Sequence, residues 1–471
     1  MKSSYKKGTA LFMAPLILGN MLNPLNSTML ATAIVVICST FKQDLGAGAL
    51  LIVPLYLTSA IGQPLMGRLA DIFSARKINV LGFILILISA AIGVFAVNFS
   101  WLIVSRILLG LGSSAAYPSA MTLIRQRYAA LQQEVPGMVL GVIATASQIS
   151  IAFGPFLGGI LTEHFGWQGI FFVNIPLVLI ALGLTAWEKK QLPLPEQEPA
   201  EAKSVKGLDL PGAGVFSILL IGFLLTLLYP YWLYIQVPAI IVVLWFFVQM
   251  EKRHLQPFIN VRLLAMNLPL STTFLRQIAI NFVMYLALYG LPQWLEQSKD
   301  INPSRVGLMM LPLSIAAMGV GLLVSRTRNH NRLQVAGTIS ITAAAAGLFL
   351  LNQHVSLLLV IGTSVLLGIS MGVITIANQA TLYVAAPVDQ VGISFGLYRT
   401  VGYIGAIVAG SRLKHEFHGG ATDTGLHSLA GYALIACGVI TIFLLPVLFN
   451  KSASQIPAKS SQSQKTDKSR L

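Results

Sequence analysis

The chain has 471 residues, of which 55% are hydrophobic and only 10% are charged, and its formal net charge is +15. A water-soluble protein of this composition would have too few polar side chains to cover its surface, so a soluble class is excluded. Apolar runs of about 20 residues recur along the whole length, each long enough to cross a hydrocarbon core of roughly 30 Å. We therefore predict an all-α polytopic membrane protein.

Fourteen membrane spans are predicted, with a polar break after the sixth. In chain order they are 11–38, 47–67, 78–98, 101–124, 138–162, 169–187, 208–228, 230–250, 269–291, 304–325, 333–352, 355–378, 391–411 and 429–449. The break, KKQLPLPEQEPAEAKSVKG, is rich in Pro and Glu, as linkers are. The basic, Ser-rich segment after residue 450 is predicted to be disordered. Neither a disulfide nor a metal site is predicted for the two cysteines, Cys38 and Cys437.

The basic residues indicate how the chain is oriented. Most of the 31 Lys and Arg residues fall in loops on the side that also carries both chain ends, and the positive-inside rule makes that side the cytoplasm. The first apolar run follows a basic start, but no cleavage site interrupts it, so it is predicted to be a retained helix. The positive charge is dispersed over short loops, which argues against binding of nucleic acid.

An internal repeat relates the two halves of the chain. Pro54 and Pro312 are 258 residues apart, and the triplet LLG recurs at the same offset, at 108–110 and 366–368. One offset across three consecutive spans means that the halves run in the same direction through the membrane. This is the arrangement of parallel repeats in facilitator-type transporters, whose binding site lies at the midplane between the halves. The offset implies two six-helix bundles with two inserted helices between them.

The first span is unusually polar, because its residues 20–36 read NMLNPLNSTMLATAIVV. Asn23 and Asn26 are predicted to face the central cavity and contact substrate. Hydrogen bonding between helices, worth around 1 kcal/mol, is the alternative role. Pro24 is predicted to bend the helix between the two asparagines.

The loop between the second and third spans, GQPLMGRLADIFSARK (62–77), combines close packing with charge. Gly67 lets helices approach, Asp71 can accept hydrogen bonds from a helix N-terminus, and Arg76 holds the loop at the cytoplasmic side. The stretch resembles the loop signature G-x-L-A-D-R-x-G-R-K of the major facilitator superfamily. The resemblance implies that this loop gates the cytoplasmic side through the aspartate. The second copy has Asn329 at the equivalent position.

Arg106 is placed inside the fourth span, in SRILLGLGSSAAYP (105–118). A charged side chain at a helix centre costs about 2.5 kcal/mol or more and is a functional candidate, whereas near the interface it only snorkels to the surface. The stretch resembles the R-x-x-x-G motif of the same superfamily. The resemblance ties the arginine to proton coupling.

The fifth span holds a proline and glycine motif, in SQISIAFGPFLGGIL (147–161). A proline removes a helix hydrogen bond and glycines leave a smooth face, so this helix is predicted to bend and to pack closely. The motif is similar to G-P-x-x-G-G of the exporters within the superfamily. Its residues, candidates for gating and coupling, are Gly154, Pro155, Gly158 and Gly159.

The stretch WQGIFFVNIP (167–176) resembles a segment of the drug:proton antiporter branch with 14 helices, and the resemblance extends from residue 11 to about residue 450. Further candidate substrate contacts are polar or aromatic groups inside spans, namely Gln148, Tyr285, Tyr289 and Arg399. The aromatic groups either pack or line a cavity for amphipathic drugs, and the arginine either lines a water-filled path or bonds to carbonyl groups. Three outer-loop histidines are read as solvated residues, with metal binding as the weaker alternative: His415, His418 and His427.

The resemblance implies a secondary exporter of drugs or other amphipathic small molecules, which works by alternating access and proton antiport. It implies the bacterial inner membrane, with a periplasmic adaptor as an option, and neither an enzyme nor a cofactor is expected, since no Walker sequence is present. The expected parts are an N-terminal bundle at 1–187, a linker with two inserted helices at 188–250, a C-terminal bundle at 251–450 and a cytoplasmic tail at 451–471.

The residue that would carry the proton is not evident from the sequence. All 16 acids are expected in loops or at span ends, with Asp71, Glu163 and Asp209 nearest to the membrane. The superfamily branch typically has an aspartate in its first helix, where this chain has Asn26, so coupling through Asp71, Glu163 or the surroundings of Arg106 stays open beside weak coupling. The alternatives are a carrier for an anionic metabolite, siderophore or lipid, favoured by the in-span arginines, and a membrane enzyme or sensor.

Overall fold

The computed structural model describes residues 2–133, 137–191, 209–254, 257–259, 261–324, 327, 330–385 and 391–449. These residues are almost entirely helical, which confirms the all-α prediction. Long helices are the expected outcome, because in lipid every backbone polar group must be bonded within its own segment. Most of the predicted linker, and the tail at 451–471, lie outside the described residues.

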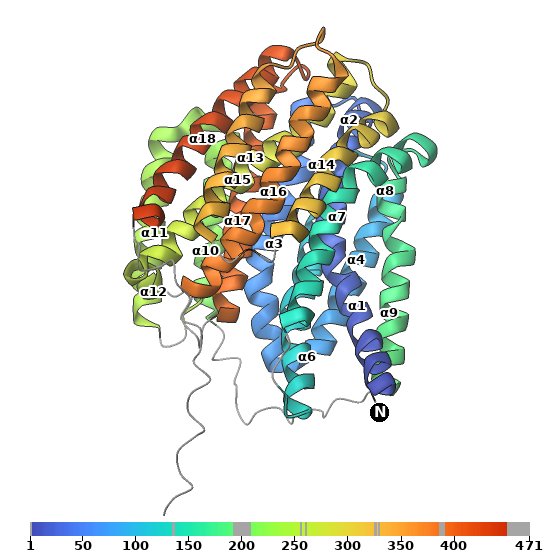
Figure 1. Cartoon of the computed structure of the whole chain (residues 1–471), viewed down its shortest axis with the longest axis vertical. Helices are drawn as coiled ribbons and strands as arrows, with labels where there is room; N and C mark the ends of the chain where they lie inside the picture. The colour runs from blue at the N-terminus through green and yellow to red at the C-terminus, as the bar shows by residue number, and fades with distance from the viewer. Residues whose placement is uncertain are drawn as a thin grey trace, which may run out of the picture.

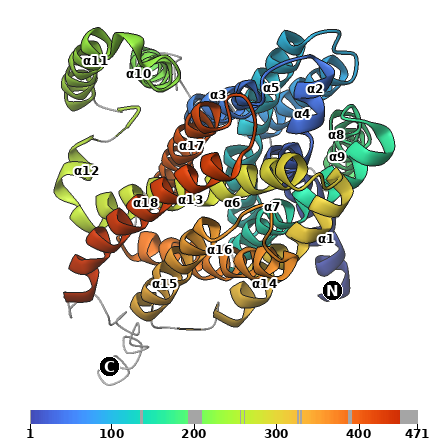
Figure 2. The same ribbon diagram turned by 90° about the horizontal axis from the view of Figure 1, so that it is seen from above.

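An N-terminal helix group occupies one side of the molecule (Figures 1 and 2). Its helices are α1 (Lys2–Met29), α2 (Ile34–Thr40), α3 (Ala49–Leu69), α4 (Ala75–Val94), α5 (Phe99–Ser114), α6 (Ala116–Ala130), α7 (Gly137–Phe165), α8 (Gly169–Phe172) and α9 (Asn174–Gln191). Short segments join them: the 3-10 turns η1 (Leu30–Thr32) and η2 (Leu45–Gly48), and the π-helical turn η3 (Ala70–Ser74).

A C-terminal helix group occupies the other side, and a helical hairpin stands outside both groups (Figure 2). The C-terminal group consists of α13 (Leu268–Ser298), α14 (Pro303–Val324), α15 (His330–Phe349), α16 (Leu357–Ala385), α17 (Val391–Glu416) and α18 (Asp423–Phe449). The hairpin consists of α10 (Leu210–Leu228), the turn η5 (Pro230–Trp232) and α11 (Leu233–Arg253), and α12 (Val261–Met266) leads from it to α13. Helix α10 packs against α3 and α17, so the hairpin touches both groups.

Eleven helices among the described residues are long and apolar enough to cross a bilayer, or 12 if a bent pair is one span. Helices α7, with 29 residues, and α17, with 26, are of similar length, but their side chains are described only in part. The prediction of fourteen spans therefore stays a prediction. The chain is a multi-pass helical membrane protein in either count.

The first predicted span is not one straight helix. Helix α1 continues through Pro24 to Met29, and the chain then turns by 63° between residues 10–32 and 34–40. The break thus comes after Pro24, between residues 32 and 34, and a bend at Pro24 itself stays a prediction. The carbonyl oxygen of Asn20, which Pro24 leaves without its helical N–H donor, instead accepts a hydrogen bond of 3.5 Å from the Ser147 hydroxyl.

The sequence repeat recurs as a repeat of contacts. Gly110 on α5 lies against the backbone carbonyl of Leu55 on α3, and a Cβ at Gly110 would lie 2.6 Å from that oxygen. Gly368 on α16 lies in the same way against the carbonyl of Leu313 on α14. Both pairs are related by the 258-residue offset. Since only glycine lets two helices approach this closely, the glycine of each LLG triplet serves helix packing in its own group.

The buried apolar clusters differ between the two ends of the molecule. We call the end that carries the N-terminus in Figure 1 the proximal end, and the opposite end the distal end. The largest cluster combines both groups at the distal side, with Met29 and Ile34 beside Trp294 and Leu413. Two proximal clusters stay within one group, with Phe12 and Tyr128 in one and Phe274 and Tyr398 in the other. A further cluster joins Ala60 of α3 to the hairpin, with Tyr403 of α17 packed against it. The two groups thus share their largest core distally.

Candidate functional site between the helix groups

The break after α1 leaves carbonyl groups that other helices satisfy. The last carbonyls of a helix lack intrahelical donors. Here the Asn26 carbonyl accepts a hydrogen bond of 3.3 Å from Arg106, and the Ser27 carbonyl accepts one of 2.7 Å from the Tyr289 hydroxyl. Arg106 belongs to the N-terminal group and Tyr289 to the C-terminal group. The end of α1 is therefore a junction between the two groups.

Arg106 is bonded to backbone and not to an acid. Its side chain is 1% exposed, and Nε donates to the Leu51 carbonyl at 2.9 Å. One terminal nitrogen has no hydrogen-bond partner among the described residues. A cation at a helix C-terminus is favoured by the helix dipole. The side chain thus holds α3 and the end of α1 against α5 and does not snorkel to the surface, and its link to proton coupling stays a prediction.

The two asparagines of the first span bond to neighbouring helices. Asn26 is 2% exposed, and its amide exchanges two hydrogen bonds with Asn174 on α9, of 2.5 and 2.7 Å. Asn23 is half-buried and donates to Ser59 at 3.0 Å and to Ser113 at 2.7 Å. Both asparagines therefore connect helices of the N-terminal group. Only Asn23 keeps part of its surface accessible.

The glycine motif of α7 has two faces. A methyl group on Gly154 or Gly158 would overlap with Thr28 or Met29 of α1, within the N-terminal group. A methyl group on Gly159 would instead overlap with Pro303 of α14, across to the C-terminal group. The carbonyl of Pro155 accepts a hydrogen bond of 3.2 Å from Thr32. The motif thus packs α7 against α1 and α14 at once, as the smooth helix face predicts.

Glu163, on α7, stabilises the contact between α7 and α14 at the distal end. Its carboxylate accepts a hydrogen bond of 3.1 Å from Asn302 and another of 3.1 Å from the backbone N–H of Ser304. Ser304 is in the first turn of α14, where an acid also meets the positive end of the helix dipole. On the other side of the molecule, Asp44 accepts a hydrogen bond of 2.5 Å from the Gly419 N–H. Both links hold the two groups together distally.

Tyrosines from both groups meet next to this junction. We call Tyr56, Tyr285, Tyr289 and Tyr403 the tyrosine cluster. The ring of Tyr56 on α3 lies 5.0 Å from that of Tyr285 on α13 and 5.6 Å from that of Tyr403 on α17, and its hydroxyl is 3.2 Å from that of Tyr289. Tyr285 and Tyr403 are only half-buried, so the cluster presents aromatic surface between the groups.

A second cross-group contact lies on the proximal side of the cluster. The guanidinium of Arg399 on α17 stacks over the ring of Tyr117 on α6, 4.3 Å from its centre, which is cation–π geometry. Gln63 on α3 donates a hydrogen bond of 3.1 Å to the Tyr403 hydroxyl. Arg399 and Tyr117 are both half-buried. Of the predicted substrate contacts, Tyr285, Tyr289 and Arg399 are brought to one interface, whereas Gln148 is a half-buried residue of α7.

The predicted cytoplasmic loop residues lie apart from the cluster. Arg76 forms an ion pair of 2.8 Å with Glu188 at the end of α9. A Cβ at Gly67 would lie 3.4 Å from Pro118 on α6, an ordinary contact. The side chain of Asp71 lies outside the described residues, although its backbone belongs to the π-helical turn η3. These residues join α3, α4, α6 and α9 within the N-terminal group.

Three further candidate side chains carry no signal in the sequence. Tyr56 and Tyr403 belong to the cluster but have no motif, and only their distance from Tyr285 in space identifies them. Glu296 was expected outside the membrane, because the ninth span was predicted to end at residue 291. Helix α13 continues to Ser298 and buries Glu296, which is 8% exposed. The acid therefore lies two residues before the end of its helix, at a span end as expected, but it is buried there.

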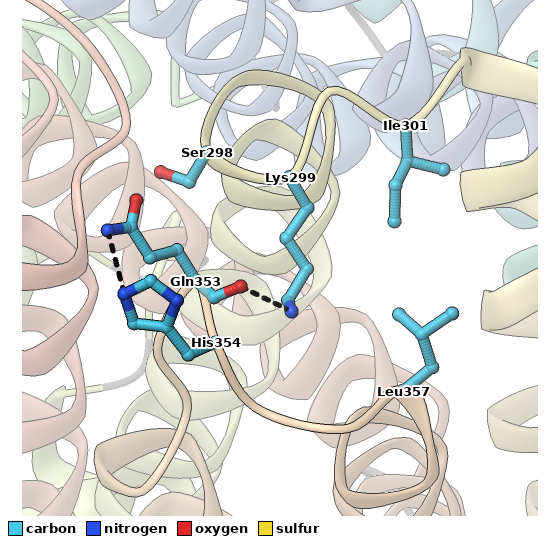
Figure 3. Close-up of a pocket in the computed structure, with 6 residues that line it drawn as sticks. All are labelled: Ser298, Lys299, Ile301, Gln353, His354 and Leu357. Atoms are coloured by element: carbon cyan, nitrogen blue, oxygen red, sulfur yellow. Dashed lines mark hydrogen bonds between the residues drawn. The ribbon is translucent and has the colours of Figure 1, made fainter.

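A separate recess lies among the distal connections of the C-terminal group, and Figure 3 shows the residues that line it. Its volume is about 470 Å³, and it lies between the α13–α14 and α15–α16 connections. Lys299 reaches across it and donates a hydrogen bond of 3.0 Å to the Gln353 carbonyl, and the Gln353 amide lies 3.2 Å from His354 Nε2. These polar groups are bonded to one another, and the recess has no aromatic surface.

The fold and the interface define a membrane carrier of two helix groups, closed at one end around an aromatic cluster. Residues 16–410 match the model of the Major Facilitator Superfamily, and the chain belongs to this superfamily. It is 31% identical over 453 residues to the uncharacterized MFS-type transporter YwoD of Bacillus subtilis (strain 168), over 93% of this chain and 97% of that protein. Like its relatives, the protein is a transporter and not an enzyme.

Other relatives differ in the substrates that their names state. The multidrug efflux pump SdrM of Staphylococcus aureus (strain N315) is 25% identical over 88% of this chain and 92% of its own length. The riboflavin transporter RibZ of Clostridioides difficile (strain 630) is 25% identical over 82% and 83%. A crystal structure of tetrameric PepTSo2 superposes with a TM-score of 0.65 at 15% identity, over 94% of this chain and 98% of that chain. That likeness shows the fold alone.

Proposed function

We propose that the protein is a secondary exporter of amphipathic aromatic small molecules, driven by proton antiport, in the branch with 14 helices. The observation that carries the proposal is the tyrosine cluster, which has half-buried aromatic surface at the junction of the two groups. Aromatic side chains with a few polar groups are typical of sites for drug-sized ligands. The multidrug pumps among the relatives support export.

Alternating access follows from the distribution of the contacts. The groups share their largest core and two hydrogen-bonded links at the distal end, whereas the proximal cores around Phe12 and Phe274 each stay within one group. We assign this arrangement to the state that faces the cytoplasm, with both termini cytoplasmic and the distal end outside the bacterial inner membrane. Export then requires the distal links to break and the proximal ends to close. The moving units in this proposal are residues 1–187 and 251–450, with 188–250 as the insertion.

A second candidate is a carrier for an anionic compound without tight proton coupling. Arg399 faces Tyr117 across the interface, and no described carboxylate forms an ion pair with it. A cation in this position favours an anionic or neutral aromatic ligand over a dication. The two candidates therefore predict different charge preferences and different dependence on the proton gradient.

A flux assay with purified protein in liposomes separates the candidates. Three fluorescent aromatic probes of different charge, riboflavin, ethidium and fluorescein, are tested with an imposed pH gradient and again with an uncoupler. Antiport predicts gradient-dependent transport that stops with the uncoupler, together with counterflow of protons reported by a pH dye. Transport of fluorescein that continues after the gradient is collapsed would favour the second candidate and refute antiport.

Arg399→Gln tests the assigned binding interface in the same assay. We expect the fluorescein rate to fall at least tenfold relative to the ethidium rate, because the cation that selects for an anion is lost. Arg305→Gln, at a residue near the distal start of α14, is the matched control and should change neither rate. Equal loss for all three probes in Arg399→Gln would mean that the residue supports structure and does not select substrate.

A further inference from the structure

Glu296 is a buried acid that has no part in the alternating-access mechanism proposed above. It lies on α13, is 8% exposed, and neither oxygen of its carboxyl group has a hydrogen-bond partner among the described residues. A carboxylate without partners in a protein interior carries a large desolvation cost, whereas the protonated acid does not. At this buried position the protonated form of the Glu296 side chain is therefore more stable than the ionised form.

Several charged groups at the distal ends of the surrounding helices have partners other than Glu296, and Arg305 on α14 and Glu416 on α17 form no ion pair in the described residues. Lys299, the nearest in sequence, donates to the carbonyls of Gln353 and Val355. On α17, Arg412 stacks over the Tyr432 ring, Lys414 bonds to the Leu228 carbonyl and His415 bonds to the Leu227 carbonyl. On α18, Asp423 accepts a hydrogen bond from Trp294 Nε1, and His427 bonds to the Leu351 carbonyl. Beyond α2, Asp44 accepts hydrogen bonds from the N–H groups of Gly46 and Gly419. Neither ion pair found in the described residues involves Glu296.

Glu296 lies on the same side of α13 as the contacts between the groups. Tyr285, Tyr289, Gln293 and Glu296 follow one another at intervals of three or four residues, which places them on one helix face. On this face Tyr289 reaches the Ser27 carbonyl of the N-terminal group. Helix α13 also packs against η1 and α2, the segments just after the break in α1. Glu296 therefore stands distal to the tyrosine cluster, on the face that the N-terminal group covers when the distal end is closed.

We propose that Glu296 is a proton-binding site of the transporter, which is loaded from the distal side and must hold its proton for the distal end to close. When the groups separate distally, the carboxyl group meets water and exchanges a proton with it. When they close, the ionised form would be buried without a partner, so closure selects the protonated form. This inference rests on the proposed antiport and supplies the carrier that the first span, with Asn26, does not provide.

The linkage can be measured without a substrate. Spin labels are placed on cysteines introduced at the exposed distal residues Ser100 and Ser356, one in each group, after replacement of Cys38 and Cys437. Distances between the labels then report the closed fraction of purified protein as a function of pH. Because closure takes up a proton, the ratio of closed to open protein should rise as the pH falls, by up to about tenfold per pH unit.

Glu296→Gln replaces the acid with a neutral group of the same shape. We expect a closed fraction that is high and no longer depends on pH. Asp300→Asn is the matched control, because this exposed carboxylate lies four residues further along the chain, and it should behave as the unsubstituted protein. A pH-dependent closed fraction that survives in Glu296→Gln would overturn the proposal, and so would its loss in Asp300→Asn.

Infrared spectroscopy gives an independent measurement if Glu296→Gln folds poorly. The protein in its closed state should show the carbonyl band of a protonated carboxylic acid at neutral pH, and Glu296→Asp should retain such a band at a shifted frequency. Absence of the band would overturn the proposal. The outcome for the proposed function is separate: a Glu296-dependent closure without proton counterflow in the flux assay would refute antiport and leave the proton site standing.

Discussion

Gly307→Ala offers a direct perturbation of the distal closure. Gly307 on α14 packs against α7, and a Cβ there would lie 2.8 Å from the Pro155 carbonyl oxygen and 3.0 Å from Phe156 Cα. Ordinary contacts begin at 3.4 Å, so the methyl group is about 0.6 Å too close to the carbonyl oxygen. Both obstructing atoms belong to backbone, so no side-chain rotation relieves the overlap. The two helices must move apart.

The cost of this overlap applies to the closed distal end and not to the fold of either group. Overpacking by one methyl group costs about 1–3 kcal/mol. If the open state is free of the contact, the ratio of closed to open protein should fall by about 5- to 150-fold. The same distance measurement between labels at residues 100 and 356 reports this change. Thermal unfolding should shift little, since α14 keeps its contacts with α16.

Gly319→Ala is the matched control on the same helix. A Cβ at Gly319 would meet nothing within 4 Å, so this substitution should leave the closed fraction unchanged and favour the helix by about 0.5–1 kcal/mol. A closed fraction in Gly307→Ala equal to that of the unsubstituted protein would refute the inference that the α7–α14 contact forms only when the distal end is closed. An equal shift in both variants would refute the steric argument.

Three further substitutions test the junction at the end of α1. Tyr289→Phe removes the hydrogen bond to Ser27 across the groups and should lower the ratio of closed to open protein by roughly fivefold, for a bond worth about 1 kcal/mol, in the same distance assay. Asn26→Asp replaces a donor by an acceptor opposite the Asn174 oxygen, so the free energy of unfolding at neutral pH should fall by about 1–3 kcal/mol. Unfolding of the protein in detergent measures this change, and an unchanged free energy would contradict the amide pair. Arg106→Gln should increase hydrogen exchange at residues 26–33, because the Asn26 carbonyl loses its donor, and unaltered exchange would contradict the role as a cap.

Periodic and local signals in the sequence predicted much of the architecture. Apolar runs predicted the helical membrane class, and the 258-residue offset predicted the repeat that recurs as the Gly110–Leu55 and Gly368–Leu313 contacts. The glycine motif of the fifth span predicted close packing, because a missing side chain has the same effect in any helix pair. The motif did not reveal that Gly158 faces α1 whereas Gly159 faces α14.

The interface between the groups depends on residues that are far apart in the chain. Tyr56 and Tyr289 are separated by 233 residues, and nothing in the sequence near either one indicates that their hydroxyl groups meet. For Asn26 the sequence left substrate contact and bonding between helices open, and the amide to which it bonds belongs to Asn174, 148 residues away. A polar residue in a span can face a cavity or a neighbouring helix, and only the position of its partner distinguishes the two.

The sequence by itself determined the membrane class, the direction of the two halves and the helices that pack closely, since these depend on composition and spacing along one segment. The tertiary structure alone decided which polar groups are paired and which are not. Glu296 shows the difference: in the sequence it is one acid near a predicted span end, whereas in the fold it is buried and has no partner in the described residues. The physical reason is that the cost of a charge depends on its surroundings, which the folded chain assembles from distant segments.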